Sequence, residues 1–124
     1  MGYTSDVVLV MYPEKPEDMP ALKLFASENM ADKFEEVKRD SPRIPVYLRW
    51  RWDRVVWYEE YPEVQAVEDV LNRWGEMFQR VGFHKYIFHY EFIRIGEDPD
   101  DTDERGTHSK ILYVAHSIRE TIAL

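Results

Sequence analysis

The spacing of apolar residues changes at Gly82, and this change limits the folds that the chain can adopt. Between Pro62 and Gly82 apolar side chains recur every three or four positions, which is typical of a helix with one buried face. Pro62 suits the first turn of such a helix, and Gly82 suits the position after its last turn. Beyond Gly82 apolar and polar residues alternate, as they do in strands. The sequence therefore predicts helices and strands in one chain, with no helix after residue 85.

The N-terminal part of the chain predicts a strand followed by another helix. Residues 5–13, SDVVLVMYP, are apolar at both alternating sets of positions, which is typical of a central strand. A helix start is indicated near Asp18, and apolar residues then follow the three-and-four spacing as far as Val37. The segment RDSPRIP ends this pattern. We expect a helix from about Asp18 to Val37.

The stretch from Tyr47 to Pro62, YLRWRWDRVVWYEEYP, contains three of the four tryptophans of the chain. If Asp53 and Arg54 form the turn of a hairpin, Trp50 and Trp57 share one face and pack in the core. Neither turn residue adopts a positive φ easily, so a slip of one residue in register would exchange the two faces. The opposite face carries a mixed set of side chains: Tyr47, Arg49, Arg51, Val56, Tyr58 and Glu60.

The C-terminal part predicts two more strands, HKYIFHYEFIRIG and SKILYVAHSIRETI, joined by the acidic loop EDPDDTDERGTH. The order of elements is therefore β-α-β-β-α-β-β. Short connections and right-handed crossovers favour a ferredoxin-like two-layer sandwich, an α+β fold with a five-stranded antiparallel sheet and two helices on one face. The last strand would lie at the edge, beside the fourth. The other face would be free of helices and open for binding, although a fold alone does not assign a function.

Composition limits the architecture and the kinds of partner. With 124 residues, 44% of them hydrophobic, the chain can build one core, so we expect a single domain over residues 1–124. The absence of cysteine excludes disulfides and thiolate metal sites and favours a reducing compartment. The first apolar run is interrupted at Tyr12-Pro13, too early for a signal peptide or a membrane span, so we expect a cytoplasmic protein without a membrane partner. A net charge of −8 disfavours direct binding of nucleic acid.

Three segments are similar to those of a known group of proteins. They are YTSDVVLVMY near the start, VVWYEEYPEVQAVEDVL in the middle and FIRIGEDPDD near the end. Together they resemble a family of small uncharacterised proteins of tailed bacteriophages and prophages, in which SDV, WYxxYPxVQ and RIGE segments occur in that order. The resemblance implies a phage origin and a place in the cytoplasm of the host bacterium. It implies no activity, cofactor or catalytic residue.

The first candidates for a binding surface are the tyrosines and arginines of the predicted outer face of the hairpin. A guanidinium group beside a tyrosine ring can hold a carboxylate, a phosphate or a nucleobase. Arg94 is a further candidate for holding a small anionic ligand such as a nucleotide. The alternative is that the hairpin arginines pair across the strands with Glu59 and Glu60. The hairpin candidates are Tyr47, Arg49, Arg51 and Tyr58.

His89, Glu91 and His116 are candidates for an enzymatic or metal site. If the last two strands pair symmetrically about their loop, His89 faces His116 and Glu91 lies one pair away on the same face. Two imidazoles and a carboxylate in that arrangement could bind a divalent metal or transfer protons. A slip of register in the long loop would separate them, and no nucleophile or metal motif accompanies these residues.

The acidic run near residue 100 is a candidate for meeting a basic partner. It includes Asp100, Asp101 and Asp103. Its spacing departs from that of an EF-hand loop, so we expect a solvated loop rather than a calcium site. The sequence has no phosphate-binding loop, nucleophile elbow or zinc-hydrolase motif, so no cofactor is expected and an enzymatic function is disfavoured.

Binding is the function that these features favour. We expect a phage accessory protein that blocks a host or anti-phage defence protein, with acidic residues speeding encounter with a basic surface and Tyr and Arg side chains anchoring the complex. A scavenger of a small anionic or nucleotide signal is one alternative, and a small enzyme that uses His89, Glu91 and His116 is another. An edge strand rich in Tyr, Trp and Arg beside an uncovered sheet face also predicts a homodimer.

Overall fold

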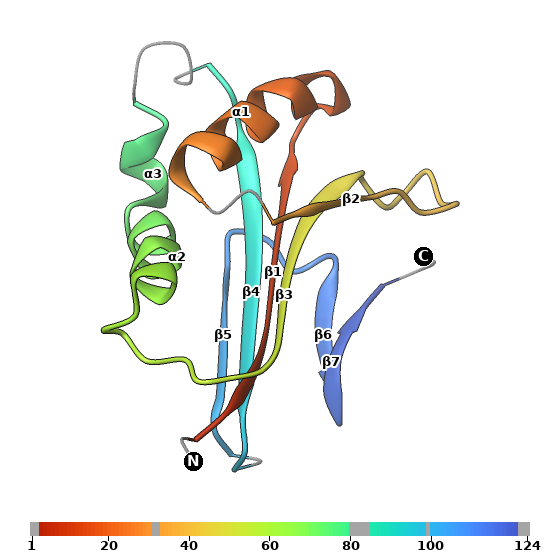
Figure 1. Cartoon of the computed structure of the whole chain (residues 1–124). Helices are drawn as coiled ribbons and strands as arrows, with labels where there is room; N and C mark the ends of the chain where they lie inside the picture. Colours follow the sequence, from red (N-terminus) through yellow and green to blue (C-terminus); the bar gives the residue numbers. More distant parts are fainter. Residues whose placement is uncertain (1–2, 31–32, 80–84, 99, 122–124) are drawn as a thin grey trace.

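A computed structural model of the chain describes residues 3–30, 33–79, 85–98 and 100–121 (Figure 1). It has an α+β fold with a five-stranded antiparallel sheet, as predicted. The order of the strands in this sheet is β2-β3-β1-β4-β5, and β6 and β7 form a separate two-stranded sheet. The strands are β1 (Ser5–Pro13), β2 (Glu35–Val37), β3 (Tyr47–Val55), β4 (Phe88–Gly96), β5 (Thr102–Gly106), β6 (Leu112–Ala115) and β7 (Ser117–Glu120). The helices are η1 (Pro16–Asp18), α1 (Met19–Asn29), α2 (Pro62–Asn72) and α3 (Trp74–Met77).

Strand β1 is the centre of the main sheet, and its sequence explains why. It pairs with β3 on one side and with β4 on the other. From Val7 to Tyr12 every side chain is buried, on both faces of the strand. An apolar residue at each position suits a strand that is covered on both faces, so the predicted central place of this strand is confirmed.

Two apolar clusters lie on the two faces of β1. The first joins Val7, Leu9 and Met11 to buried residues of α1, α2 and α3 and includes Trp50 and Trp74. The second joins the alternate residues of β1 to the segment that carries β6 and β7, which lies across the sheet from α2 and α3 (Figure 1). The face expected to lie open is thus partly covered by a hairpin. Members of the second cluster include Val8, Val10, Tyr12, Ile93, Ile111, Leu112 and Ile118.

The first helix is shorter than predicted. Helix α1 ends at Asn29, Met30 has an extended backbone, and residues 35–37 form the edge strand β2 instead of further helical turns. Phe34 packs against Trp50 in the first cluster, whereas Val37 packs against the second. Residues three apart lie on one side of a helix but on opposite faces of a strand. Phe34 and Val37, which have the spacing of a helix, therefore cover two opposite faces of a sheet in this structure.

The predicted hairpin turn at Asp53 and Arg54 is wrong. Strand β3 continues through both residues to Val55 and pairs along its length with β1, with Leu9 opposite Trp50. Arg54 has a positive φ of 51°, and its backbone N–H donates to Oδ1 of Asp6 at 2.8 Å, where the register with β1 shifts. The strained backbone is thus a local irregularity of a long strand, held by a side chain of its neighbour.

The C-terminal segment does not supply the fifth strand of the main sheet. That strand is β5, which lies within the residues expected to form the acidic loop. It pairs with β4, and Glu104 of β5 lies opposite Ile93 of β4. Strands β6 and β7 pair only with each other, around a turn at His116, which has a positive φ of 65°. An edge strand exposes one face and one edge to water, so β5 can be almost wholly polar and escape a search for apolar alternation.

The second predicted helix is interrupted. Helix α2 ends at Asn72, Arg73 has a non-helical backbone, and α3 continues from Trp74. The predicted cap at Gly82 lies outside the described residues. The described residues after 85 contain no helix, as predicted. No helix of the described part of the chain is long and apolar enough to cross a membrane.

Candidate functional site

Polar side chains on the face of β3 that points away from the helices converge on Glu120 of β7. Tyr47 donates its hydroxyl to Oε1 of Glu120 at 2.5 Å, and Arg49 donates to both carboxylate oxygens at 2.9 and 2.8 Å. Arg51 donates to Oε2 at 3.0 Å, and Arg39 donates to Oε1 at 3.3 Å. These five residues, Arg39, Tyr47, Arg49, Arg51 and Glu120, are called the Glu120 cluster below.

The carboxylate at the centre of the Glu120 cluster is shielded from water. Only 7% of the Glu120 side chain is exposed. Burial opposes ionisation of this carboxyl, but the hydrogen bonds from Tyr47 and Arg49 outweigh it, so its pKa lies below the usual value. Burial and the Glu120 carboxylate raise the pKa of Tyr47 to about 12. Glu120 of β7, and not Glu59 or Glu60, is therefore the shared partner of Arg49 and Arg51.

Arg94 and two of the predicted acidic residues are also engaged inside the chain. Arg94 binds both carboxylate oxygens of Asp101 at 2.6 and 3.0 Å, and it lowers the pKa of Asp101 to about 2. Asp103 pairs with Arg105 at 3.2 Å, and Arg105 binds both oxygens of Glu68 at 2.8 Å. Asp100 differs from these two aspartates: within the described residues its carboxylate has no partner, and it is exposed.

The connection between β3 and α2 carries the tyrosine patch, which consists of residues 58–61. The rings of Tyr58 and Tyr61 are stacked, with centroids 5.9 Å apart and an angle of 25° between their planes. They are 39% and 45% exposed. Glu59 and Glu60 between them are exposed, and neither has a hydrogen bond or ion pair in the described part of the chain. Of the predicted binding residues on this segment, Tyr58 alone faces solvent beside unpaired carboxylates.

The three residues of the predicted metal or enzyme site do not meet. His89 contacts Glu14 through Nε2, and its ring stacks on that of His108 at 4.8 Å. His116 lies at the exposed turn between β6 and β7. The pairing of β4 with β5 is the reason, because β6 and β7 then pair with each other and the predicted register between His89 and His116 does not form.

Glu91 is buried and serves the backbone. Its two carboxylate oxygens accept hydrogen bonds from the N–H groups of Lys110, Ile111 and Leu112, at 2.8 to 3.1 Å. The Tyr12 hydroxyl donates to it at 2.7 Å. Burial of the Tyr12 hydroxyl raises its pKa, and the neighbouring Glu91 carboxylate raises it further. A carboxylate with this many donors anchors the start of β6 and has few acceptor positions left for a substrate or a metal.

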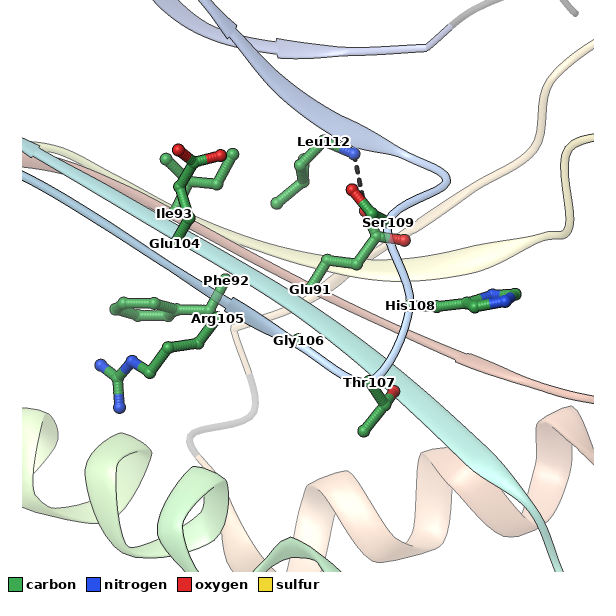
Figure 2. A pocket seen from close by; sticks show the side chains of 10 residues that line it. All are labelled: Glu91, Phe92, Ile93, Glu104, Arg105, Gly106, Thr107, His108, Ser109 and Leu112. Atoms are coloured by element: carbon green, nitrogen blue, oxygen red, sulfur yellow. Dashed lines mark hydrogen bonds between the residues drawn. The ribbon is translucent and has the colours of Figure 1, made fainter.

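A hollow of about 430 Å³ lies beside Glu91, between β4, β5 and the segment that leads to β6. Figure 2 shows the Glu91 carboxylate directed toward the backbone N–H of Leu112, whereas Phe92 and Arg105 extend to the other side of the sheet. Ser109 and Glu104 also line the hollow. No group of three or more His, Asp or Glu side chains among the described residues is placed to hold a metal ion.

The sequence did not identify five members of these sites: Glu120, Arg39, Tyr61, Glu14 and His108. Glu120 was not singled out because it lies in a short C-terminal strand whose partner strand cannot be deduced from periodicity. Glu14 and His108 were missed as neighbours of His89 because each lies just beyond the end of a strand. A useful signal was the excess of arginine in the first half of β3, since buried arginines need carboxylates from elsewhere in the chain.

Comparison with known proteins identifies no relative. No family model, no curated protein and no solved structure matches this chain.

Proposed function

We propose that the protein acts by binding a partner protein that has a basic surface, and that the tyrosine patch is the contact. The observation that carries this proposal is the exposed stacked pair of Tyr58 and Tyr61 beside the unpaired Glu59 and Glu60. Exposed tyrosines are frequent anchors of protein interfaces because they bury a large area at a small cost in side-chain entropy. Unpaired carboxylates around them favour Lys and Arg on the partner.

The distribution of charge supports an acidic binding surface. The chain carries a net charge of −8, and the arginines of the Glu120 cluster, Arg94 and Arg105 are all bound to carboxylates of the same chain. Excess negative charge is thus left on exposed residues such as Glu59, Glu60 and Asp100. A surface potential of one sign speeds the encounter with an oppositely charged partner, and added salt weakens this effect.

The biological setting is proposed from the resemblance to small phage proteins. We propose a phage accessory protein of the host bacterial cytoplasm that blocks a host or anti-phage defence protein. The tyrosine patch belongs to the segment WYEEYPEVQ, on which the middle part of that resemblance depends. A small enzyme is disfavoured because His89, Glu91 and His116 do not converge.

We also propose that the architecture is ferredoxin-like with its helices on one face. The strand order β2-β3-β1-β4, the alternation of strands and helices along the chain and the helix residues of the first apolar cluster support this assignment. In it β5 takes the place beside β4 that was expected for the last strand.

The proposed interface is tested by affinity capture from a bacterial lysate. A double variant, Tyr58→Ala with Tyr61→Ala, should lose the retained protein, since an anchoring tyrosine is worth about 2 kcal/mol or more in binding free energy. Leu24→Ala is the control because it removes another exposed large apolar side chain, from α1, outside the proposed interface. Glu59→Gln with Glu60→Gln should weaken retention and make it less sensitive to salt.

Two results would count against the proposal. If the tyrosine double variant retains the partner as well as Leu24→Ala does, the contact lies elsewhere on the protein. If the unchanged protein retains no basic partner at all, scavenging of a small anion becomes the better proposal.

A further inference from the structure

The Glu120 cluster has more hydrogen-bond donors than its carboxylate can accept. Five hydrogen bonds from Arg39, Tyr47, Arg49 and Arg51 end on the two oxygens of Glu120. A carboxylate offers about four lone-pair positions. The Nε atoms of Arg39 and Arg49 are buried as well and have no partner in the described part of the chain. Buried donors without acceptors are rare in folded proteins and call for an explanation.

The charges of the Glu120 cluster also indicate that negative charge is in short supply there. Three guanidinium groups surround one shielded carboxylate, and the other acidic contacts are Glu35 on Arg49 and Asp53 on Arg51. Both of these acidic side chains are more than 60% exposed, so water screens them. The buried part of the cluster is therefore rich in positive charge and in directed donors, which suits an anion with more charge and more oxygens than a carboxylate.

The position of Glu120 allows it to be replaced. It is the last residue of β7, which pairs with β6 and not with the main sheet. The arginines and Tyr47, in contrast, come from β3 and the segment before it, and β3 is held on both sides by β1 and β2. Arg51 is 38% exposed and gives the cluster an opening to solvent. Withdrawal of Glu120 would leave the donors in place and would break no pairing of the five-stranded sheet.

We propose that Arg39, Tyr47, Arg49 and Arg51 form a binding site for a phosphate group, and that Glu120 is an internal occupant which the phosphate displaces. The three terminal oxygens of a phosphate monoester provide acceptors for the surplus donors, and guanidinium groups bind such oxygens in pairs. The ligand is inorganic phosphate or a small molecule that carries a phosphate monoester. This site is separate from the tyrosine patch, so either proposal can fail without the other.

The test removes the internal occupant. Glu120→Ala in the full chain should bind inorganic phosphate at least about tenfold more tightly than the unchanged protein, measured by calorimetry at constant ionic strength with chloride as the balancing anion. Glu35→Ala is the matched control, because it removes an exposed carboxylate from the same Arg49 and should leave phosphate affinity near that of the unchanged protein. Adding Arg49→Ala to Glu120→Ala should abolish the gain. A phosphate monoester such as methyl phosphate is titrated in parallel, and tighter binding than that of inorganic phosphate would assign the site to phosphorylated ligands.

The outcome is decisive even if the variant folds poorly. In that case phosphate should raise the melting temperature of Glu120→Ala, or of the isosteric Glu120→Gln, by several degrees more than chloride does at the same ionic strength. Equal effects of phosphate and chloride would overturn the proposal. Equal effects of phosphate and acetate would overturn the assignment to phosphate, because the cluster would then be a receptor for carboxylates only.

Discussion

Two buried carboxylates organise the C-terminal part of this protein. Glu91 receives three backbone N–H groups just before and at the start of β6, and Glu120 receives three arginines and a tyrosine at the end of β7. The removal of either would leave several buried donors without acceptors, which costs more than the loss of an exposed ion pair. Both carboxylates thus help to hold the hairpin on the sheet, together with the buried side chains of Ile111, Leu112 and Ile118.

The hydrogen bonds of Asp101 predict how the stability of the protein depends on pH. Hydrogen bonds from Arg94 and Tyr3 lower its pKa from 3.8 to about 2. A lowered pKa in the folded state means that the contact contributes stability above about pH 4 and loses it as the pH falls toward 2. Asp101→Asn should therefore have a lower urea midpoint than the unchanged protein near neutral pH, and the difference should vanish as the pH approaches about 2.

The neighbouring aspartate provides the control for this prediction. Asp100→Asn changes an exposed carboxylate that has no partner among the described residues, so its urea midpoint should differ little from that of the unchanged protein at neutral or acidic pH. A difference for Asp101→Asn that persists unchanged in acid would show that the ion pair is not its cause.

At the scale of elements, β5 shows how a polar segment becomes a strand. Four of its five residues are Thr, Asp, Glu and Arg, and none of them is fully buried. Its stability comes from pairing with β4 and from Arg105, which lies over the ring of Phe92 at 4.4 Å and binds Glu68 of α2. The strand exists because its neighbours provide partners, and its own periodicity contributes little.

Gly106 at the end of β5 should not tolerate a side chain. A Cβ at this position would lie 2.8 Å from the carbonyl oxygen of Tyr90 and 2.9 Å from that of His108, and backbone atoms cannot move aside as a flexible side chain can. Gly106→Ala should lower the free energy of unfolding by about 1 to 3 kcal/mol, measured by urea denaturation.

Gly75 in α3 is the matched control for this substitution. A Cβ there meets no atom within 4 Å, so Gly75→Ala should leave stability unchanged or raise it by up to about 1 kcal/mol, because alanine favours a helix more than glycine does. If both variants had the same stability, steric exclusion at Gly106 would not be the determining factor.

At the scale of the whole molecule, the free strand edges differ in how they can meet a second copy. The edge strand β5 carries Asp103 and Glu104, so two copies of it would repel each other. Strand β6 exposes Tyr113 and Val114, which are 46% and 40% exposed. An apolar edge on a small hairpin is the better place for symmetric association.

The strand rich in Tyr, Trp and Arg is not the expected edge, because β3 pairs with β1 and with β2. We therefore predict a homodimer that forms through β6. Sedimentation equilibrium at micromolar concentration should return twice the chain mass of 14.9 kDa. Val114→Lys should return the mass of one chain, because a charge would then lie on the paired edge. Leu24→Lys is the control, since it places the same charge at another exposed apolar residue, on α1, and should leave the dimer intact. A single-chain mass for the unchanged protein would contradict the prediction.

The features that depend on local periodicity could be predicted from the order of the residues alone. Six consecutive apolar residues predicted a central place for β1, and the apolar stripe from Val67 to Trp74 predicted a helical segment with one face on the core. Alternation along β3 separated Trp50 from Arg49 and Arg51, and these faces persisted although the predicted turn was wrong. Such patterns are read from neighbours in sequence, so they need no knowledge of the tertiary structure.

Which segments meet depends on long-range packing and could not be predicted from local patterns. Phe34 and Val37 fit a helix and an edge strand equally well until Trp50 and the second cluster gave them opposite faces to cover. The polar β5 became a strand because β4 had a free edge, and Glu120 became the partner of Arg49 and Arg51 because the hairpin crossed the sheet. The candidate site depends on these long-range contacts, because a buried charge takes whichever partner the fold brings to it.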